Sequence, residues 1–542
     1  MALLTRPIRR RLGRPTAVLV PLALAITVTI AATACHSDRG PSSGASDTTV
    51  TDASDAHRPL RSEAAPGRVP DPSVAPLSEG RGRAVGGLRF DVGAFGYEEG
   101  EFSFGGRARA IAAAGLPPAP YRSRMIVWTP RDPREFNGTT VVEWAQVSDV
   151  GDFELTVETN DEAAMLMEDG YAFAVVSAEQ RGVCAPTADG CPGTSLVGAD
   201  PERYGALRHP GDAYAFDIFD QAIEAIRFPT GVAPLGGLDT RLVIAQGFQR
   251  SVAKYFPHGT PDPPPADAPL GVHGPLNAYL ASGSDDDARL VDAFLVDGAA
   301  PAGQPEGYRV PTLHHLDESA IEAEPTPDGP NHVTWEVVGA PHADRWSVDH
   351  VELPGPGPLA PRLSLPEEQA RRARFDDFGV TEDPAGAVCA PGTARGTRFP
   401  RRYSLTAALA ALRTWLETGV PAPAAPRVER ADPLPDDAAQ TLARDRDGTA
   451  RGGLRLPIVT VPSSAYDGEA CISSGTSALL PASRLASLYP SHRDYVRRLA
   501  TATDRAVADG FLRCPDAEDI LQVASASDVG GDDRFETAPA CA

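Results

Sequence analysis

The sequence predicts an α/β protein with a mostly parallel central sheet covered by helices, enlarged by insertions and ended by a helical C-terminal extension. From about residue 80 onward, short apolar runs alternate with stretches of helical periodicity. Such alternation is typical of parallel strands joined by crossover helices. Composition does not change along this body, so we expect one domain.

Several runs have the length and apolar composition of buried strands. They cover residues 124–129, 139–147, 171–177, 241–246, 293–296, 310–313 and 333–338. After the third run, Phe216, Phe219 and Ile223 recur at helical spacing on one face, and Asp212 is the expected N-cap of this helix. Further amphipathic helices are expected over residues 404–418 and 495–511.

Residues 1–34 have the layout of an export signal, with clustered arginines followed by a largely apolar stretch. Its last residues, Ala32-Thr33-Ala34, precede Cys35 and resemble the lipobox of bacterial lipoproteins, although Ala32 departs from the usual leucine. We expect a lipidated Cys35 and attachment to the outer face of the cell membrane. Cleavage without lipidation, giving a secreted protein, is the alternative, and the arginine cluster fits both general and twin-arginine export.

The segment after the signal, residues 35–75, is rich in Ser, Thr, Asp, Pro and Gly and is predicted to be a disordered tether. We expect the folded domain over residues 76–528 and a short tail over 529–542. The net charge of −23 disfavours nucleic acid and anionic lipid as partners. Membrane contact is therefore expected only through the lipid, and no motif indicates a cofactor.

Cysteine usage fits an exported chain. Apart from Cys35, the cysteines are Cys184, Cys191, Cys389, Cys471, Cys514 and Cys541. An even number in an oxidising compartment predicts disulfides, and Cys184 with Cys191 is the easiest local pair. The other pairings stay open. No Cys-x-x-Cys spacing is present, so a structural role is favoured over metal binding.

The pentapeptide Gly247-Phe248-Gln249-Arg250-Ser251 follows a predicted buried strand and precedes a segment that can open a helix. This is the context of a nucleophile elbow, the sharp strand-to-helix turn that presents a catalytic serine. The turn requires small residues two before and two after the nucleophile, and Gly247 and Ser251 meet that requirement. Gln249 therefore stands where the nucleophile is expected.

Several further blocks appear in order along the body. They are Val-Val-Glu-Trp at 141–144, Asp-Pro-Glu-Arg-Tyr-Gly at 200–205, His-Pro-Gly-Asp-Ala-Tyr at 209–214, Trp-Glu-Val at 335–337, Gly-Ala-Pro-His-Ala-Asp at 339–344, Gly-Gly-Leu-Arg-Leu-Pro at 452–457, Leu-Tyr-Pro at 488–490 and Asp-Tyr-Val at 494–496. Together they resemble a family of bacterial exported α/β-hydrolase-domain proteins, serine esterases whose substrates are mostly unassigned. The resemblance spans most of the body and implies an α/β-hydrolase fold.

This resemblance also marks departures at the working parts of the site. The family elbow looks like Gly-x-Ser-Gln-Ser, so Gln249 replaces its serine. The family's loop after the strand that carries Val-Val-Glu-Trp continues with glycines, whereas this chain has Ser148 and Asp149. That loop, together with the backbone of Arg250, should supply the oxyanion-hole N–H groups. Asp149 would place negative charge near a developing oxyanion, which is the wrong sign.

The histidine and acid of a triad are expected after the last two strands. His342 lies in a loop after the strand 333–338, at the position and in the chain order that hydrolases of this fold require. For the acid, the family reads Thr-Glu-x-Asp, and the final Asp is Ala320 here. The resemblance therefore leaves Glu318, or Asp317, to orient His342.

Other polar residues favour structural roles. His209 is interpreted as a loop anchor. A metal site built from His314, His315 and the nearby acidic residues is disfavoured, because consecutive strand residues point to opposite faces and cannot share an ion.

Two functional hypotheses follow. The first is an exported hydrolase-fold protein whose serine mechanism is lost or impaired, and which binds a small ester-like ligand or a protein partner. The second is an active carboxylic-ester hydrolase that uses Ser251, or another hydroxyl, with His342 and Glu318. A purely structural envelope protein is a third class, which binds no ester.

Overall fold

The structure is a computed structural model. It describes residues 71–77, 83–88, 90–111, 115–147, 154–155, 157–184, 190–191, 195–248, 290–298, 308–322, 325–342, 344–346, 362–372, 377–379, 397–432, 442–470, 475–531, 535 and 541.

A nine-stranded sheet forms the centre, in the order β1-β2-β3-β7-β4-β8-β9-β10-β11. Its strands are β1 (Ser73–Pro76), β2 (Tyr97–Ala108), β3 (Ala119–Pro130), β4 (Thr139–Trp144), β7 (Ala172–Val176), β8 (Leu242–Phe248), β9 (Ala293–Asp297), β10 (Thr312–Leu316) and β11 (His332–Glu336). The strands from β1 to β3 are antiparallel, and β3 pairs antiparallel with β7. All pairings from β7 to β11 are parallel. The predicted α/β class with a mostly parallel sheet is confirmed.

Smaller elements complete the described chain. Two short hairpins pair β5 (Gln146–Val147) with β6 (Glu154–Leu155), and β12 (Ser464–Asp467) with β13 (Thr476–Leu479). The α-helices are α1 (Val157–Glu168), α2 (Gln180–Cys184), α3 (Leu196–Ala199), α4 (Pro201–Tyr204), α5 (Ala215–Arg227), α9 (Leu365–Arg372), α10 (Arg401–Thr418), α11 (Pro457–Thr460), α12 (Ala482–Leu488), α13 (His492–Ala508) and α14 (Cys514–Ala526).

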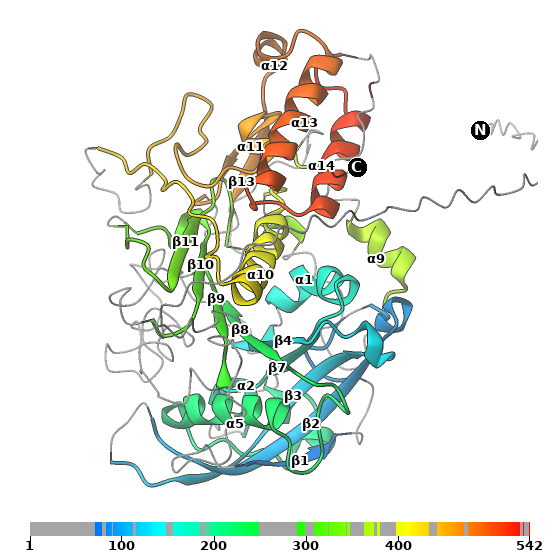
Figure 1. The fold of residues 1–542 in the computed structure, drawn as a ribbon, viewed down its shortest axis with the longest axis vertical. Coiled ribbons are helices and arrows are strands. Elements are labelled where there is room, and N and C mark those ends of the chain that lie inside the picture. The colour runs from blue at the N-terminus through cyan, green and yellow to red at the C-terminus, as the bar shows by residue number, and fades with distance from the viewer. Residues whose placement is uncertain are drawn as a thin grey trace, which may run out of the picture. The chain divides into compact units, whose positions relative to one another are not determined.

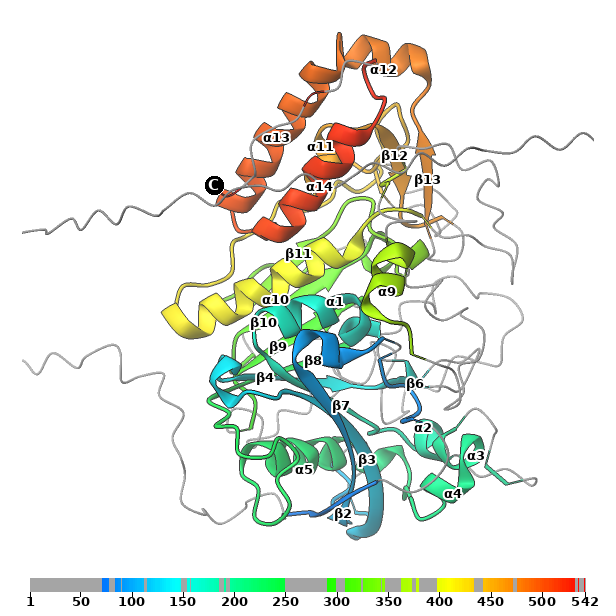
Figure 2. The same cartoon turned by 90° about the vertical axis from the view of Figure 1, so that its right-hand side faces the viewer.

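Helices cover both faces of the sheet (Figure 1). On one face α5 buries the predicted stripe of Phe216, Phe219 and Ile223, in one cluster with Val142 of β4. On the other face α1 and α10 pack over a second cluster that contains Val141. The side chains of the neighbouring residues Val141 and Val142 therefore pack on opposite faces of the sheet, because successive strand residues point to opposite sides. Beyond α10 lie α13 and α14, which form the predicted helical C-terminal extension (Figure 2).

The structure differs from the sequence-based expectation at several boundaries. The long strand β2 was not predicted, because its Glu- and Gly-rich sequence lacks an apolar run. The first strand begins at Ser73, inside the segment expected to be a tether. Asp212 is not the N-cap of α5. It starts a 3₁₀ turn, and its side chain accepts a hydrogen bond from the backbone of Gln180 instead.

Two disulfides lie among the described residues. Cys184 is bonded to Cys191, as predicted, and Cys514 to Cys541. Cys389 and Cys471 lie outside the described residues. Within the part of the chain that is described, no helix is both long and apolar enough to cross a membrane.

Candidate active site

The candidate site is built at the carboxyl ends of the parallel strands. Parallel strands end at the same edge of a sheet, and ligands of open α/β sheets bind outside that edge. Asp317 directly follows β10, and the loop after β11 reaches His342 within a few residues. Since β10 and β11 are neighbours in the sheet, their following residues meet.

Asp317 and His342 form a hydrogen-bonded pair. Nδ1 of His342 lies 3.2 Å from Oδ2 of Asp317. The other oxygen of Asp317 accepts the backbone N–H groups of Ser319, at 2.8 Å, and Ala320, at 3.1 Å, together with the Ser319 hydroxyl. These bonds fix the carboxylate, and Asp317 is fully buried whereas His342 is 8% exposed.

Electrostatics keep this carboxyl ionised. Burial raises the pKa of Asp317, but the hydrogen bonds from His342 and Ser319 outweigh burial and leave its pKa below the ordinary value. An ionised Asp317 holds the proton of His342 on Nδ1, which leaves Nε2 as the basic nitrogen. The pair is thus arranged as the acid–histidine half of a hydrolase triad.

The expected acid Glu318 does not contact His342. Its carboxylate accepts N–H groups from Gly339, at 2.6 Å, and Gly468, at 2.9 Å, and pairs with Arg444 at 3.0 Å. Burial raises the pKa of Glu318 to about 7. The assignment of Glu318 as the partner of His342 is therefore corrected to Asp317. Consecutive side chains at the end of β10 point in different directions, and sequence alone could not choose between them.

The replacement of the family's later Asp by Ala320 leaves no gap in the site. Asp317 supplies the carboxylate three residues earlier, from the first position after β10. Of the departures identified in the sequence, the one at the acid is thus filled by a neighbouring residue.

The rest of the predicted site lies outside the described residues. It comprises Gln249, Arg250, Ser251, Ser148 and Asp149, together with the lipidation site Cys35. The described chain ends just before both predicted segments, because β8 ends at Phe248 and β5 at Val147. Those assignments stay predictions.

His209 anchors a loop near the same edge of the sheet. Its Nε2 bonds the carbonyl of Ala178 at 2.8 Å, and its Nδ1 accepts the N–H of Gly211 at 3.2 Å. Burial lowers its pKa. This arrangement agrees with the anchoring role predicted for His209.

A buried array was missed by the sequence reasoning. His315 bonds Asp297 through Nδ1 at 2.7 Å and Ser404 through Nε2 at 2.9 Å, and none of these side chains is exposed. Arg401 pairs with Asp297 and, at 2.7 Å, with Asp161. The available signal was a titratable residue just after an apolar run, which holds for Asp297 after residues 293–296 and for His315 after residues 310–313.

The two adjacent histidines point to opposite faces. Nδ1 of His314 lies 3.1 Å from Nε2 of His332, away from the partners of His315. Among the described residues, one acidic cluster has the geometry to hold a metal ion, namely Glu318, Asp467 and Glu469. Arg444 lies within hydrogen-bond distance of all three and supplies their positive charge.

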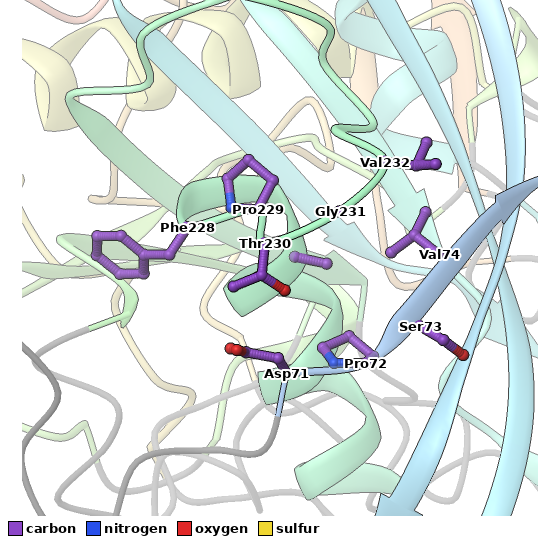
Figure 3. A pocket seen from close by; sticks show the side chains of 10 residues that line it. Asp71, Pro72, Ser73, Val74, Phe228, Pro229, Thr230, Gly231 and Val232 are labelled. Carbon is purple, nitrogen blue, oxygen red and sulfur yellow. The ribbon is translucent and has the colours of Figure 1, made fainter.

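A cavity of about 350 Å³ lies at the other edge of the sheet. It is lined by Asp71 to Val74 at the start of β1 and by the chain from Phe228 to Val232 after α5 (Figure 3). The strands β1 and β11 are the two edges of the sheet, so this cavity is separate from Asp317 and His342. Asp71 is its single titratable lining residue among those described.

The sheet order, the crossover helices and the acid–histidine pair after the last two strands define an α/β-hydrolase architecture. Residues 69–522 match the alpha/beta hydrolase domain family, so the chain belongs to that family.

Solved structures of esterases are also similar to parts of it. A cold-adapted esterase from an Arctic intertidal metagenomic library is 13% identical. The match covers 40% of this chain and 71% of the esterase chain, with a TM-score of 0.19. A glucuronoyl esterase from Solibacter usitatus is 10% identical over 47% of this chain and 70% of its own, with a TM-score of 0.24. No curated protein gives a significant match.

Proposed function

We propose that this protein is an exported member of the family whose serine-nucleophile mechanism is lost or impaired, and that it binds a small ester-like ligand or a protein partner. The observation that carries this is the glutamine at position 249, which follows β8 directly and stands at the centre of the elbow predicted from the sequence. A glutamine amide has no proton that a histidine can remove to make a nucleophile. Loss of a triad serine typically removes about six decades of rate, roughly 8 kcal/mol.

A second candidate is an active carboxylic-ester hydrolase. The Asp317–His342 pair favours it, because such a pair serves to take a proton from a hydroxyl. The hydroxyl would come from Ser251 or from outside the elbow. If Ser251 were the nucleophile, however, Gln249 would occupy a position where the turn needs a small side chain.

A fluorophosphonate probe separates the two candidates. We expect no stable labelling of the native protein. Stable labelling that disappears in both Ser251→Ala and His342→Ala would overturn the binding-protein proposal and establish the hydrolase. A thermal-shift screen with an ester library then tests binding, and a complete lack of response would favour a structural envelope protein.

Restoring the serine tests what remains of the site. Because Asp317 still holds His342, we expect Gln249→Ser to gain measurable hydrolysis of a short p-nitrophenyl ester. Gln249→Ala is the matched control, since it removes the glutamine without adding a hydroxyl, and the gain should vanish in Gln249→Ser/His342→Ala. No gain in Gln249→Ser would show that the altered oxyanion loop is also unable to support the reaction.

Export is supported by the signal-like residues 1–34 and by the disulfides Cys184–Cys191 and Cys514–Cys541, which persist in oxidising compartments. Labelled fatty acid should enter the native protein and not Cys35→Ala. A soluble extracellular product without label would replace the lipoprotein proposal by simple secretion.

A further inference from the structure

The loop that carries His342 is held by Glu318. The N–H of Gly339 donates to Oε1 of Glu318 at 2.6 Å, and the backbone N–H of Glu318 donates to the carbonyl of Ala340 at 2.9 Å. Two hydrogen bonds of opposite direction therefore fasten residues 339–342, which we call the histidine loop, to the residue next to Asp317. Glu318 is fully buried, so water does not compete for the groups that make these hydrogen bonds.

The second oxygen of Glu318 faces the C-terminal part of the chain. Its Oε2 accepts the N–H of Gly468 at 2.9 Å and pairs with Nη2 of Arg444 at 3.0 Å. The same nitrogen of Arg444 lies 2.7 Å from Asp467 and 2.9 Å from Glu469. One guanidinium thus joins a carboxylate beside the active pair to two carboxylates at the end of β12.

The backbone at the end of β12 is packed against the histidine loop. A Cβ placed on Gly468 would lie 2.1 Å from the carbonyl oxygen of Ala340. A Cβ on Gly475, whose φ is +62°, would lie 3.0 Å from the Cβ of Pro341. At Gly468 even a methyl group would displace the loop, so this contact requires a glycine.

We propose that Glu318 and Arg444 are positioning residues: the C-terminal segment, through Arg444 and Glu318, sets the place of His342 opposite Asp317. Without the guanidinium, three carboxyl groups would lie together, two of them buried, and the second oxygen of Glu318 would lose the cation that holds it, which frees the side chain to leave Gly339. The histidine loop would then lose a hydrogen bond that fixes it. This inference holds whether the site hydrolyses a ligand or only binds it.

The test is hydrogen exchange of the peptide that contains Gly339 in the full-length protein. We expect Arg444→Met to speed exchange at Gly339 about tenfold or more, the loss expected for one charge-assisted hydrogen bond. Arg444→Lys should recover part of the protection. Arg484→Met is the matched control, since Arg484 also lies in the C-terminal part and pairs with Asp447 at 2.8 Å. It should leave the histidine loop unchanged.

A second variant covers the case in which Arg444→Met does not fold. Gly468→Ala removes no charge, and its φ allows alanine, yet its methyl group would meet the Ala340 carbonyl. It should also speed exchange at Gly339 and separate His342 from Asp317 in a crystal structure. Unchanged Gly339 protection in the folded variants, whatever their melting temperature, would overturn the proposal.

Catalysis gives an independent readout if Gln249→Ser is active. Adding Arg444→Met should then lower kcat at least tenfold with little change in KM, because the base and not the ligand contacts is displaced. If Gln249→Ser is inactive, the proposed function is revised while the exchange experiment still decides the positioning role.

Discussion

The described part of the chain contains two histidine–carboxylate pairs at the ends of neighbouring strands, and they differ in what surrounds them. His315 bonds Asp297 at 2.7 Å and Ser404 at 2.9 Å with none of the three side chains exposed, which is the Ser-His-Asp order of a triad. The His342–Asp317 contact is longer, at 3.2 Å, and its carboxylate also accepts the Ser319 hydroxyl and two backbone N–H groups. Connectivity alone would select the wrong pair.

Access and competing partners decide between them. Asp297 is also paired with Arg401, and the Ser404 hydroxyl lies 2.9 Å from the carbonyl of Arg401, to which it donates. A serine in a closed core, where no substrate can reach it, cannot act as a nucleophile. The His315 array is therefore a buried polar connection between α10 and the strands β9 and β10. The His342 pair is the candidate site.

The buried His315 array also contacts the segment that carries His342. Asp344, two residues after His342, accepts the backbone N–H of Arg401 at 3.3 Å. The histidine loop is thus fixed on one side by Glu318 and followed on the other by a residue that caps the start of α10. The free energy of unfolding should depend mainly on the buried His315 array, and function on the His342–Asp317 pair.

The largest effect on stability is expected from Arg401→Met. Its guanidinium is fully buried and compensates both Asp161 and Asp297, so its removal leaves buried carboxylates without their counter-charge. Breaking such a pair costs about 3–5 kcal/mol of unfolding free energy. Denaturant unfolding measures it, with Arg505→Met as the control, because the exposed Arg505–Asp509 pair contributes about 0.5 kcal/mol or less. A loss below about 1 kcal/mol for Arg401→Met would mean that the array does not hold α10.

A smaller contrast is expected between the two histidines. His315→Ala removes two buried hydrogen bonds and leaves a cavity, for a loss of about 2–4 kcal/mol. His342→Ala leaves Asp317 bonded to Ser319 and Ala320, so about 1 kcal/mol or less is expected. The activity gained in Gln249→Ser should show the reverse order, with His342→Ala abolishing it. Equal stability losses would contradict the division into a structural and a functional pair.

The fold could be predicted from sequence because several of the parallel strands contain a compact apolar run, as Leu242–Phe248 and Ala293–Asp297 do, and these runs alternate with helical patterns. The strand β2 could not, since its partners and not its own composition make it a strand. The position of His342 followed from its place after the last strand. The choice of Asp317 over Glu318 did not, because it depends on where Arg444, more than a hundred residues away, draws the neighbouring carboxylate.

The same limit applies to the closed array. Asp297, His315 and Ser404 come from three separate segments, and only the register of β9 on β10, which pairs Asp297 with His315, brings the first two together. Local pattern therefore indicates where polar groups interrupt apolar runs, and tertiary register decides which of them meet.

The smallest expected effect is on the pH dependence of the free energy of unfolding, where His315 and Glu318 should act in opposite directions. Burial lowers the pKa of His315 from 6.5 to about 4, so between these values the unfolded chain binds a proton that the folded protein does not. Stability from this group is lost as the pH falls through that window. Burial raises the pKa of Glu318 from 4.5 to about 7, so here the folded protein binds the extra proton and stability is gained as the pH falls.

Variants should separate these opposite slopes. The destabilisation by His315→Ala should be smaller at about pH 5 than at about pH 8, because the variant lacks the group that loses stability in acid. The destabilisation by Glu318→Gln should be smaller at about pH 8, where the native protein carries a buried charge beside Asp467 and Glu469 that the amide avoids. Unfolding free energies of the native protein and both variants at the two pH values give the result directly. If the destabilisation by both variants changed with pH in the same direction, Arg444 would keep Glu318 ionised well below neutral pH. The hydrogen bonds of Glu318 to the histidine loop would then be stronger than its burial implies.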